Sequence, residues 1–314
     1  MKPAIEVHQL TRTFGRIKAV DRVAFDVYPG EVFGFLGPNG AGKTTTVRML
    51  TGVIDPSDGT AVIQGHDIRR APLRSRAHIA VVPEEANVYL DLTVWQNIML
   101  MAELHGIPRR QRTGKADQLL DALGIADRKK QKARMLSKGL RQRLMLCAAL
   151  VTDPEIIFLD EPTSGLDVES ARLMRQIVAD LNKDGLTVFL TTHNMTEAGD
   201  MCARVAIINS GRIAAIDTPE NLRAAISSRQ YVEVAFSMDL PDQDQLETIT
   251  GVFEMKPALR RFTLYTDTPG QVAAEVVRWA DQKGHQIAGI SIHKPSLEDV
   301  YLHFTRTRRA GGSQ

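Results

Sequence analysis

A nine-residue glycine loop, GPNGAGKTT at 37–45, constrains the fold of this chain more than any other segment. The apolar run at 32–36 predicts a short buried strand before the loop, and residues 43–51 predict a helix that closes near Gly52. The loop matches the pattern G-x-x-x-x-G-K-[ST] in the context that this motif requires, between a strand and a helix. The sequence therefore predicts an α/β domain with a phosphate-binding loop.

Each part of this loop has a role in binding a nucleotide. Glycines let the backbone wrap closely, so that its N–H groups point at phosphates, and the N-terminus of the next helix favours an anion. Lys43 reaches the β- and γ-phosphates as a point charge, and Thr44 offers its hydroxyl to Mg²⁺. A glycine-rich turn before a helix is the alternative, but the strand, the helix and the full motif favour a phosphate loop. The candidate binding residues are Gly37, Pro38, Asn39, Gly40, Ala41, Gly42, Lys43, Thr44 and Thr45.

Two carboxylates follow the apolar run IIFL at 156–159. Asp160 ends this predicted strand, as the metal-supporting carboxylate of such sites does. Glu161 comes next, and a carboxylate just beyond Mg²⁺ and the γ-phosphate can take the proton of an attacking water, which is worth roughly 10²–10⁴ in rate. The alternative is a surface acidic pair at a strand end, but the segment PTSGLD at 162–167 follows directly and favours function.

Four further candidates also have simpler explanations. His193 follows the strand TVFLTT, at the edge of a parallel sheet where ligand sites form, and it can hold the γ-phosphate or the water, or be structural. Ser137 and Gly139 open a helix, and Ser137 is a good N-cap, which by itself explains it. Phe14 lies near a strand end, where an aromatic usually belongs to the core; its alternative role is stacking on adenine, worth on the order of 1–3 kcal/mol.

Apolar spacing divides the chain into regions of different secondary structure. The first 30 residues alternate in places, which predicts antiparallel strands, and residues 85–150 have helical spacing. Residues 168–182 predict a helix whose inward face consists of Leu173, Ile177, Val178 and Leu181. Apolar runs predict buried parallel strands at 156–159, 188–190 and 205–208. Strand, helix and strand in succession form the crossover unit of a parallel sheet.

The pattern changes after about residue 227. Strands are predicted at 230–236, 251–255, 260–266 and 286–292, and helices at 242–249, 270–283 and 296–304. Without the last helix, this β-α-β-β-α-β order is ferredoxin-like. We therefore predict a nucleotide-binding domain with antiparallel and helical subdomains over 1–227, the helical one at about 85–150. A small α+β domain follows over 228–306, and a disordered tail over 307–314.

Composition limits the class of protein. The chain has 314 residues and a net charge of +2, so nothing implies binding to nucleic acid. Its start has no apolar signal-peptide core, and the longest apolar run, at 144–151, is too short to cross a bilayer. Cys147 and Cys202 share no metal-ligand spacing, so we expect reduced, buried or semi-buried thiols in a cytoplasmic protein. We expect any action at a membrane to require a partner.

Taken together, the motifs resemble the nucleotide-binding subunits of ABC transporters over roughly residues 4–225, with every motif in order. In that family two subunits pair head to tail, and each ATP lies between the glycine loop of one and the signature segment of the other. The resemblance implies that Ser137 and Gly139 touch the γ-phosphate of the ATP that the partner chain holds. It also places Asp167 at the dimer interface and Phe14 where the family has its adenine-stacking aromatic. The implied catalytic residues are Lys43, Glu161 and His193, with ATP and Mg²⁺ as cofactors.

Three positions in two motifs depart from the family's pattern. The usual signature is LSGGQ, and this chain has Lys138 and Leu140 in place of glycine and glutamine. The usual glutamine after VP is Glu84 here. In the family that position ligates Mg²⁺ and senses the membrane partner, and a carboxylate can still serve a hard cation. The metal-binding residues implied by the resemblance are therefore Thr44, Asp160 and Glu84.

The C-terminal segment KPSLEDVYLHFT at 294–305 resembles the end of the accessory domain of type-2 exporters, which handle drugs, antibiotics, lipids or polysaccharides. An ordinary capping helix on a small domain is the alternative. The segment after Glu84 lies where family members receive a short helix of the membrane subunit. Tyr89, Leu92 and Trp95 offer an apolar docking groove there, or belong to the helical core.

The function expected from this resemblance is that of an ATPase subunit that powers an exporter. Its partners would be a membrane-spanning permease and a second ATP-binding subunit, and it would lie at the cytoplasmic face of the membrane as a peripheral protein. One alternative is a soluble ABC ATPase in DNA repair or translation, but such proteins usually carry two ATP domains or a long coiled coil. The other is a regulator that does not hydrolyse ATP. The intact Lys43, Asp160, Glu161 and His193 argue against it.

Overall fold

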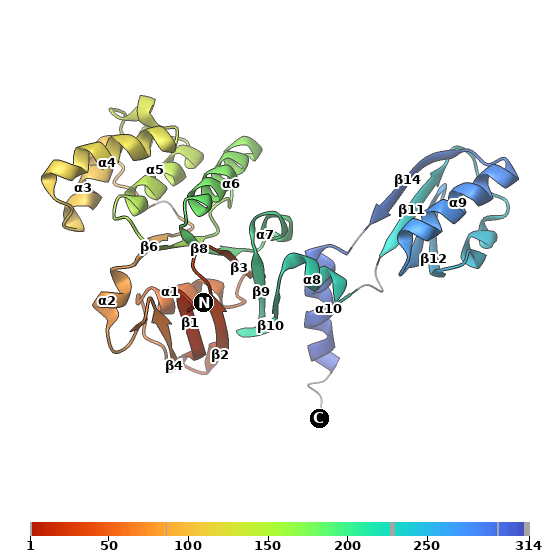
Figure 1. Cartoon of the computed structure of the whole chain (residues 1–314), viewed down its shortest axis with the longest axis horizontal. Coiled ribbons are helices and arrows are strands. Elements are labelled where there is room, and N and C mark those ends of the chain that lie inside the picture. The colour runs from red at the N-terminus through yellow and green to blue at the C-terminus, as the bar shows by residue number, and fades with distance from the viewer. Residues whose placement is uncertain (1, 86, 227–229, 294, 311–314) are drawn as a thin grey trace. The chain divides into compact units, whose positions relative to one another are not determined.

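The chain forms two compact units, Met1–Thr218 and Pro219–Gln314. The computed structural model describes residues 2–85, 87–226, 230–293 and 295–310 (Figure 1). The division falls before the predicted boundary at 227, because helix α8 (Pro219–Ala224) packs against helix α10 (Leu297–Ala310) of the second unit. Helix α10 also continues through 307–310, where a disordered tail is predicted. Residues 311–314, and Lys294 of the predicted exporter-like segment, lie outside the described part.

A six-stranded sheet forms the centre of the first unit, in the order β10-β9-β3-β8-β7-β6. Strands β6, β7, β8, β3 and β9 are parallel, and β10 is antiparallel to β9. The strands are β3 (Val32–Leu36), β6 (Ile79–Val82), β7 (Ile156–Asp160), β8 (Thr187–Thr192), β9 (Arg204–Asn209) and β10 (Arg212–Asp217). Because β3, β7 and β8 are parallel neighbours, the segments that follow them leave the same edge of the sheet.

A second, antiparallel sheet covers one side of this layer in the order β2-β1-β4-β5. Its strands are β1 (Ile5–Phe14), β2 (Ile17–Val27), β4 (Asp58–Ile63) and β5 (His66–Asp67). Helix α1 (Lys43–Leu50) contributes Val47 and Leu50 to the core between the sheets. Phe25 of the antiparallel sheet stacks on Phe33 of the central sheet at 5.3 Å between ring centroids. This shared aromatic core fixes β3, and with it the start of the glycine loop.

Helices gather in the region predicted to be helical, and Figure 1 shows them together in yellow and green. Mutually packed are α3 (Val94–Leu104), α4 (Arg109–Ala122) and α5 (Lys138–Leu150); α6 (Val168–Lys183) also contacts α5. Helices α2 (Pro72–Arg76) and α7 (Met195–Met201) are short. Helix α6 buries Met174, Ile177 and Val178, but the predicted inward residue Leu173 is 39 % exposed. Leu173 lies about 100° around the helix from Met174, which places it outside the apolar stripe.

The second unit contains a four-stranded antiparallel sheet in the order β12-β13-β11-β14. Its strands are β11 (Tyr231–Phe236), β12 (Val252–Ala258), β13 (Arg261–Thr266) and β14 (Ile287–His293). Helix α9 (Pro269–Lys283) packs its face with Val272 and Val276 on this sheet. The ferredoxin-like order of strands is thus confirmed. The first connection, Gln243–Thr248, is a 3₁₀ segment rather than the predicted α-helix, and buries only Leu246.

Within the described residues, no helix combines the length and apolar character needed to span a bilayer.

Candidate nucleotide-binding site

The glycine loop lines a cavity of about 280 Å³ at the start of α1. Glu84 and Glu161, which are far from the loop in sequence, line the same cavity. Its lining residues are Ala19, Pro38, Asn39, Gly40, Gly42, Lys43, Thr44, Thr45, Glu84 and Glu161. The structure therefore brings together most of the predicted phosphate-binding residues and two of the predicted carboxylates.

Two glycines are required for the shape of this loop. A Cβ at position 37 would collide with the carbonyl oxygen of Ile208, and a Cβ at position 42 would lie 2.6 Å from the carbonyl oxygen of Ala19. Gly42 has φ +108, a left-handed conformation that disfavours any side chain. It also precedes α1 without supplying a side-chain cap. The residue that opens α1 therefore leaves the first N–H groups of the helix uncapped. An anion that binds at a helix N-terminus needs such free N–H groups.

The Lys43 side chain is held across the loop. Its ammonium donates hydrogen bonds to the carbonyl oxygens of Gly37 (2.7 Å) and Pro38 (3.3 Å). Its Nζ also lies 3.1 Å from Oε1 of Glu161, and both side chains are less than 10 % exposed. A buried ammonium and a buried carboxylate thus stabilise each other at the wall of the cavity.

Glu161 occupies a strained backbone position just beyond β7. Its φ is +51, and its N–H donates to the carbonyl oxygen of Thr191, 3.1 Å away on β8. Oε2 accepts a hydrogen bond from the backbone N–H of His193, 3.3 Å away, and lies 2.8 Å from Nδ1 of the same residue. Oε1 has no hydrogen-bond partner among the described residues, apart from its ion pair with Lys43. A non-glycine residue with positive φ is often found at functional sites, where the surroundings maintain the strain.

Asp160 and Thr44 form the second polar group of the site. The buried Asp160 carboxylate accepts a hydrogen bond from the Thr191 hydroxyl, and Oδ1 lies 3.5 Å from the hydroxyl oxygen of Thr44. Oxygen ligands of this kind suit Mg²⁺, which usually takes one or two protein ligands together with substrate phosphates and water. In the described ranges no cluster of three His, Cys, Asp or Glu side chains is placed to hold a metal. The oxygen atoms of Asp160 and Thr44 by themselves fit Mg²⁺ that is bound together with a nucleotide.

Thr191 and Glu197 support the site and were not predicted from the sequence. Thr191 contacts both Asp160 and the backbone of Glu161. The buried Glu197 of α7 accepts hydrogen bonds from Thr163 (2.7 Å) and Thr192 (2.9 Å). The signal available in the sequence was the pair of threonines before His193, but threonine is common in strands for its β-branched shape alone.

The signature-like residues do not line this cavity in their own chain. Ser137 caps α5, since its hydroxyl accepts the N–H of Leu140 at 3.3 Å. A Cβ on Gly139 would come 2.6 Å from Oγ of Ser170, so the glycine permits close packing of α5 against α6. Asp167 caps α6, and its hydrogen bonds from Ser170 lower the pKa of the Asp167 carboxyl. Each residue thus has a local structural role within one chain.

Phe14 is not a core residue, so the simpler explanation for it is wrong. It ends β1 with 47 % of its surface exposed, and the Arg12 guanidinium lies 4.6 Å from the ring centroid. Phe14 pairs with Ile17 across the tight β1–β2 hairpin, and Ala19 of the same hairpin lines the nucleotide cavity. An exposed ring on this hairpin is available for contact with a base.

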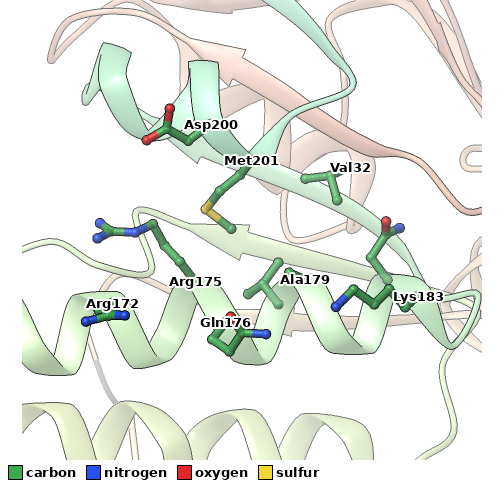
Figure 2. A pocket seen from close by; sticks show the side chains of 10 residues that line it. Val32, Arg172, Arg175, Gln176, Ala179, Lys183, Asp200 and Met201 are labelled. Carbon is green, nitrogen blue, oxygen red and sulfur yellow. The ribbon is translucent and has the colours of Figure 1, made fainter.

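A larger groove, of about 410 Å³, lies between α6 and α7 (Figure 2). Apolar and charged side chains line it together, and Met201 points into it from the side opposite Ala179. Arg172 and Arg175 contribute positive charge, and neither has an ion pair with a described residue. None of the sequence-predicted site residues lies in this groove. Without a glycine loop or the strand-end carboxylates it lacks the groups that bind a nucleotide with Mg²⁺.

Comparison with known proteins gives concordant results. A family profile described as "ABC transporter" matches residues 20–164. The chain is 34 % identical to the daunorubicin resistance ATP-binding protein DrrA3 of Streptomyces coeruleorubidus, over 96 % of each chain. It is also 34 % identical to the Nod factor export ATP-binding protein I of Paraburkholderia xenovorans, over 96 % of this chain and 97 % of that one.

Two solved structures resemble the nucleotide-binding unit. One is an ATP-binding subunit of an ABC transporter, with a TM-score of 0.65 and 27 % identity over 71 % of this chain and 92 % of the other. The other is CbiO1 of Clostridium perfringens, part of the ABC transporter complex CbiONQ, with a TM-score of 0.66 and 25 % identity over the same shares.

Proposed function

This chain belongs to the ABC transporter family of ATP-binding proteins, and we propose that it hydrolyses ATP to power a membrane exporter as one of two paired subunits. The contact between Lys43 and Glu161 at the wall of the cavity is the observation that carries the hydrolytic role. It places a phosphate-binding cation and a candidate general base side by side. A protein that only bound ATP would not need a buried carboxylate there.

Lys43 controls the availability of Glu161 in this proposal. The Lys43 ammonium would turn from Glu161 to the γ-phosphate of bound ATP, which would leave Oε1 of Glu161 free to take a proton from water. His193 would keep the carboxylate oriented through its contact with Oε2. Thr44 and Asp160 would hold Mg²⁺, which when bound neutralises charge that develops on the phosphates.

A second subunit is part of the proposal because the signature-like segment does not line its own chain's cavity. Ser137 and Lys138 are exposed at the start of α5, and neither borders the glycine loop. The family resemblance assigns Ser137 and Gly139 to the ATP of a partner chain. The exposure of Ser137 supports its assignment, since a face that contacts a second subunit must be accessible in one chain alone. Gly139 is buried in its own chain, where it packs against α6.

Export is supported by relatives that match both units of this chain. The two relatives described above are named for daunorubicin resistance and for Nod factor export, and each is similar over 96 % of this chain. We propose that the permease docks near Tyr89 and Trp95, at the cytoplasmic face of the membrane. Tyr89 and Leu90 are exposed, and the Trp95 ring lies under the Lys129 ammonium at 3.7 Å. This surface is apolar with a positive border.

Purification of the tagged full-length chain from membranes tests this function. We expect a membrane-spanning protein to copurify with it in mild detergent, and Trp95→Ala to reduce the amount recovered without reducing ATP binding. Tyr28→Ala is a matched control, because Tyr28 is another exposed aromatic residue of the same unit. Recovery of ribosomes or DNA in place of a membrane protein would contradict the exporter role. Equal recovery with a correctly folded Trp95→Ala variant would contradict the docking site.

A further inference from the structure

The loop between β7 and α6 is held from two sides by hydrogen bonds to Ser164. The ammonium of Lys138, in the first turn of α5, donates to the carbonyl oxygen of Ser164 at 2.7 Å. The Ser164 hydroxyl in turn donates to Oε1 of Glu84 at 3.2 Å. Ser164 thus connects the signature-like segment with Glu84, at the edge of the nucleotide cavity. Lys138 and Glu84 are two of the positions at which the chain departs from the family's usual residues.

Lys138 is placed where a cation is otherwise unfavourable. It is the first residue of α5, and positive charge near a helix N-terminus is opposed by the helix dipole. The Ser164 carbonyl oxygen offsets this unfavourable interaction, because it accepts a hydrogen bond from the ammonium. The neighbouring Gly165 has φ +63, and a Cβ there would lie 2.6 Å from Nζ of Lys138. The turn is therefore shaped to receive the lysine, and the ammonium serves this contact within its own chain.

Glu84 is held at the edge of the cavity by a neutral hydroxyl alone. The residue is exposed, lines the cavity with Thr44, and has no ion pair with a cation among the described residues. A single bond from a hydroxyl restrains a carboxylate without neutralising it. The Glu84 carboxylate can therefore lose its hydrogen bond from Ser164 and bind a cation near Thr44 instead.

We propose that Lys138 and Ser164 are positioning residues that hold Glu84 back from the Mg²⁺ site. In this arrangement Lys138 fixes the turn that carries Ser164, and Glu84 reaches the cation only when its bond to Ser164 breaks. The proposal rests on the proposed ATP–Mg²⁺ function of the cavity. It assigns Lys138 a role that differs from direct contact with a phosphate, and it links α5 to the metal-binding edge of the same chain.

Mg²⁺ titration of nucleotide binding tests this link. The purified full-length protein would be mixed with a fluorescent β,γ-imido analogue of ATP, and binding would be followed as Mg²⁺ is raised. Ser164→Ala should lower the half-saturating Mg²⁺ concentration about three- to tenfold, as expected for one lost hydrogen bond. Lys138→Met should shift it in the same direction by less, because Lys138 acts through Ser164. Ser291→Ala, in the second unit, is the control and should leave it unchanged.

A double-mutant cycle with Glu84→Gln separates this link from a merely structural role. In the Glu84→Gln background, Ser164→Ala should no longer change the Mg²⁺ dependence. An unchanged midpoint in Ser164→Ala, or an equal shift with and without the Glu84 carboxylate, would overturn the proposal. Lower affinity for the analogue without a change in Mg²⁺ dependence would overturn it as well. If the wild-type chain showed no Mg²⁺-dependent binding, the proposed function itself would be rejected.

Discussion

Replacing Lys43 with methionine should destabilise the first unit through the carboxylate that it leaves behind. Lys43→Met removes the ammonium but keeps most of the apolar stem. The side chain of Glu161 is 8 % exposed, and its Oε1 lies 3.1 Å from Nζ in the wild type. At an effective dielectric constant of about 20, a pair at this distance attracts by about 5 kcal/mol. Removing one partner of a buried pair costs roughly 3–5 kcal/mol. Since His193 still contacts Glu161, we expect a loss of about 3 kcal/mol.

The double variant Lys43→Met/Glu161→Gln is the matched control. It leaves no charge at either position 43 or position 161, so we expect it to recover at least about 2 kcal/mol of what the single variant loses. Urea unfolding without nucleotide would measure the free energy of unfolding of the single and the double variant. The chain has two tryptophans, Trp95 in the first unit and Trp279 in the second, so a Trp279→Phe background confines the fluorescence signal to the unit that contains the site. A loss below about 1 kcal/mol in the single variant, or a double variant that is no more stable, would refute the electrostatic reasoning.

Two further predictions concern other groups in the first unit. Burial raises the pKa of the Cys147 and Cys202 thiols, so neither should react with iodoacetamide at neutral pH until the chain unfolds, as mass spectrometry would show; rapid labelling of the folded chain would contradict this. Hydrogen bonds from Lys18 and Arg212 lower the pKa of Asp21. That stabilisation is present above the unfolded pKa of about 3.9 and is lost as the pH falls through the lowered folded pKa. Asp21→Asn should therefore melt below the wild type at pH 6, with a difference that disappears in acid; a constant difference would contradict the assignment.

The glycine loop and its neighbours could be predicted because their chemistry is local. The strand predicted at 32–36 is β3, and the helix predicted from Lys43 is α1, because a phosphate loop needs glycines, a lysine and a hydroxyl within a few residues. The end of β7 at Asp160 was likewise predicted, since a buried parallel strand reads as a continuous apolar run. In each case the sequence segment contains the whole signal.

Contacts between distant segments could not be predicted in the same way. The bonds from Thr191 to Asp160 and to the backbone of Glu161 depend on the pairing of β7 with β8. The exposure of Phe14 depends on the turn of the β1–β2 hairpin, and that of Leu173 on the rotation of α6 against the core. The link from Lys138 through Ser164 to Glu84 joins three segments that only the folded chain brings together.

ATP turnover by Glu161→Gln, compared with the wild type, tests the central claim most directly. The substitution keeps the shape of the side chain and removes the carboxylate that faces Lys43 and His193. Binding of a fluorescent ATP analogue and release of phosphate would be measured on the same purified samples. We expect binding to be retained and turnover to fall roughly 10²–10⁴-fold. Hydrolysis at the wild-type rate would contradict the assignment of Glu161 as the general base.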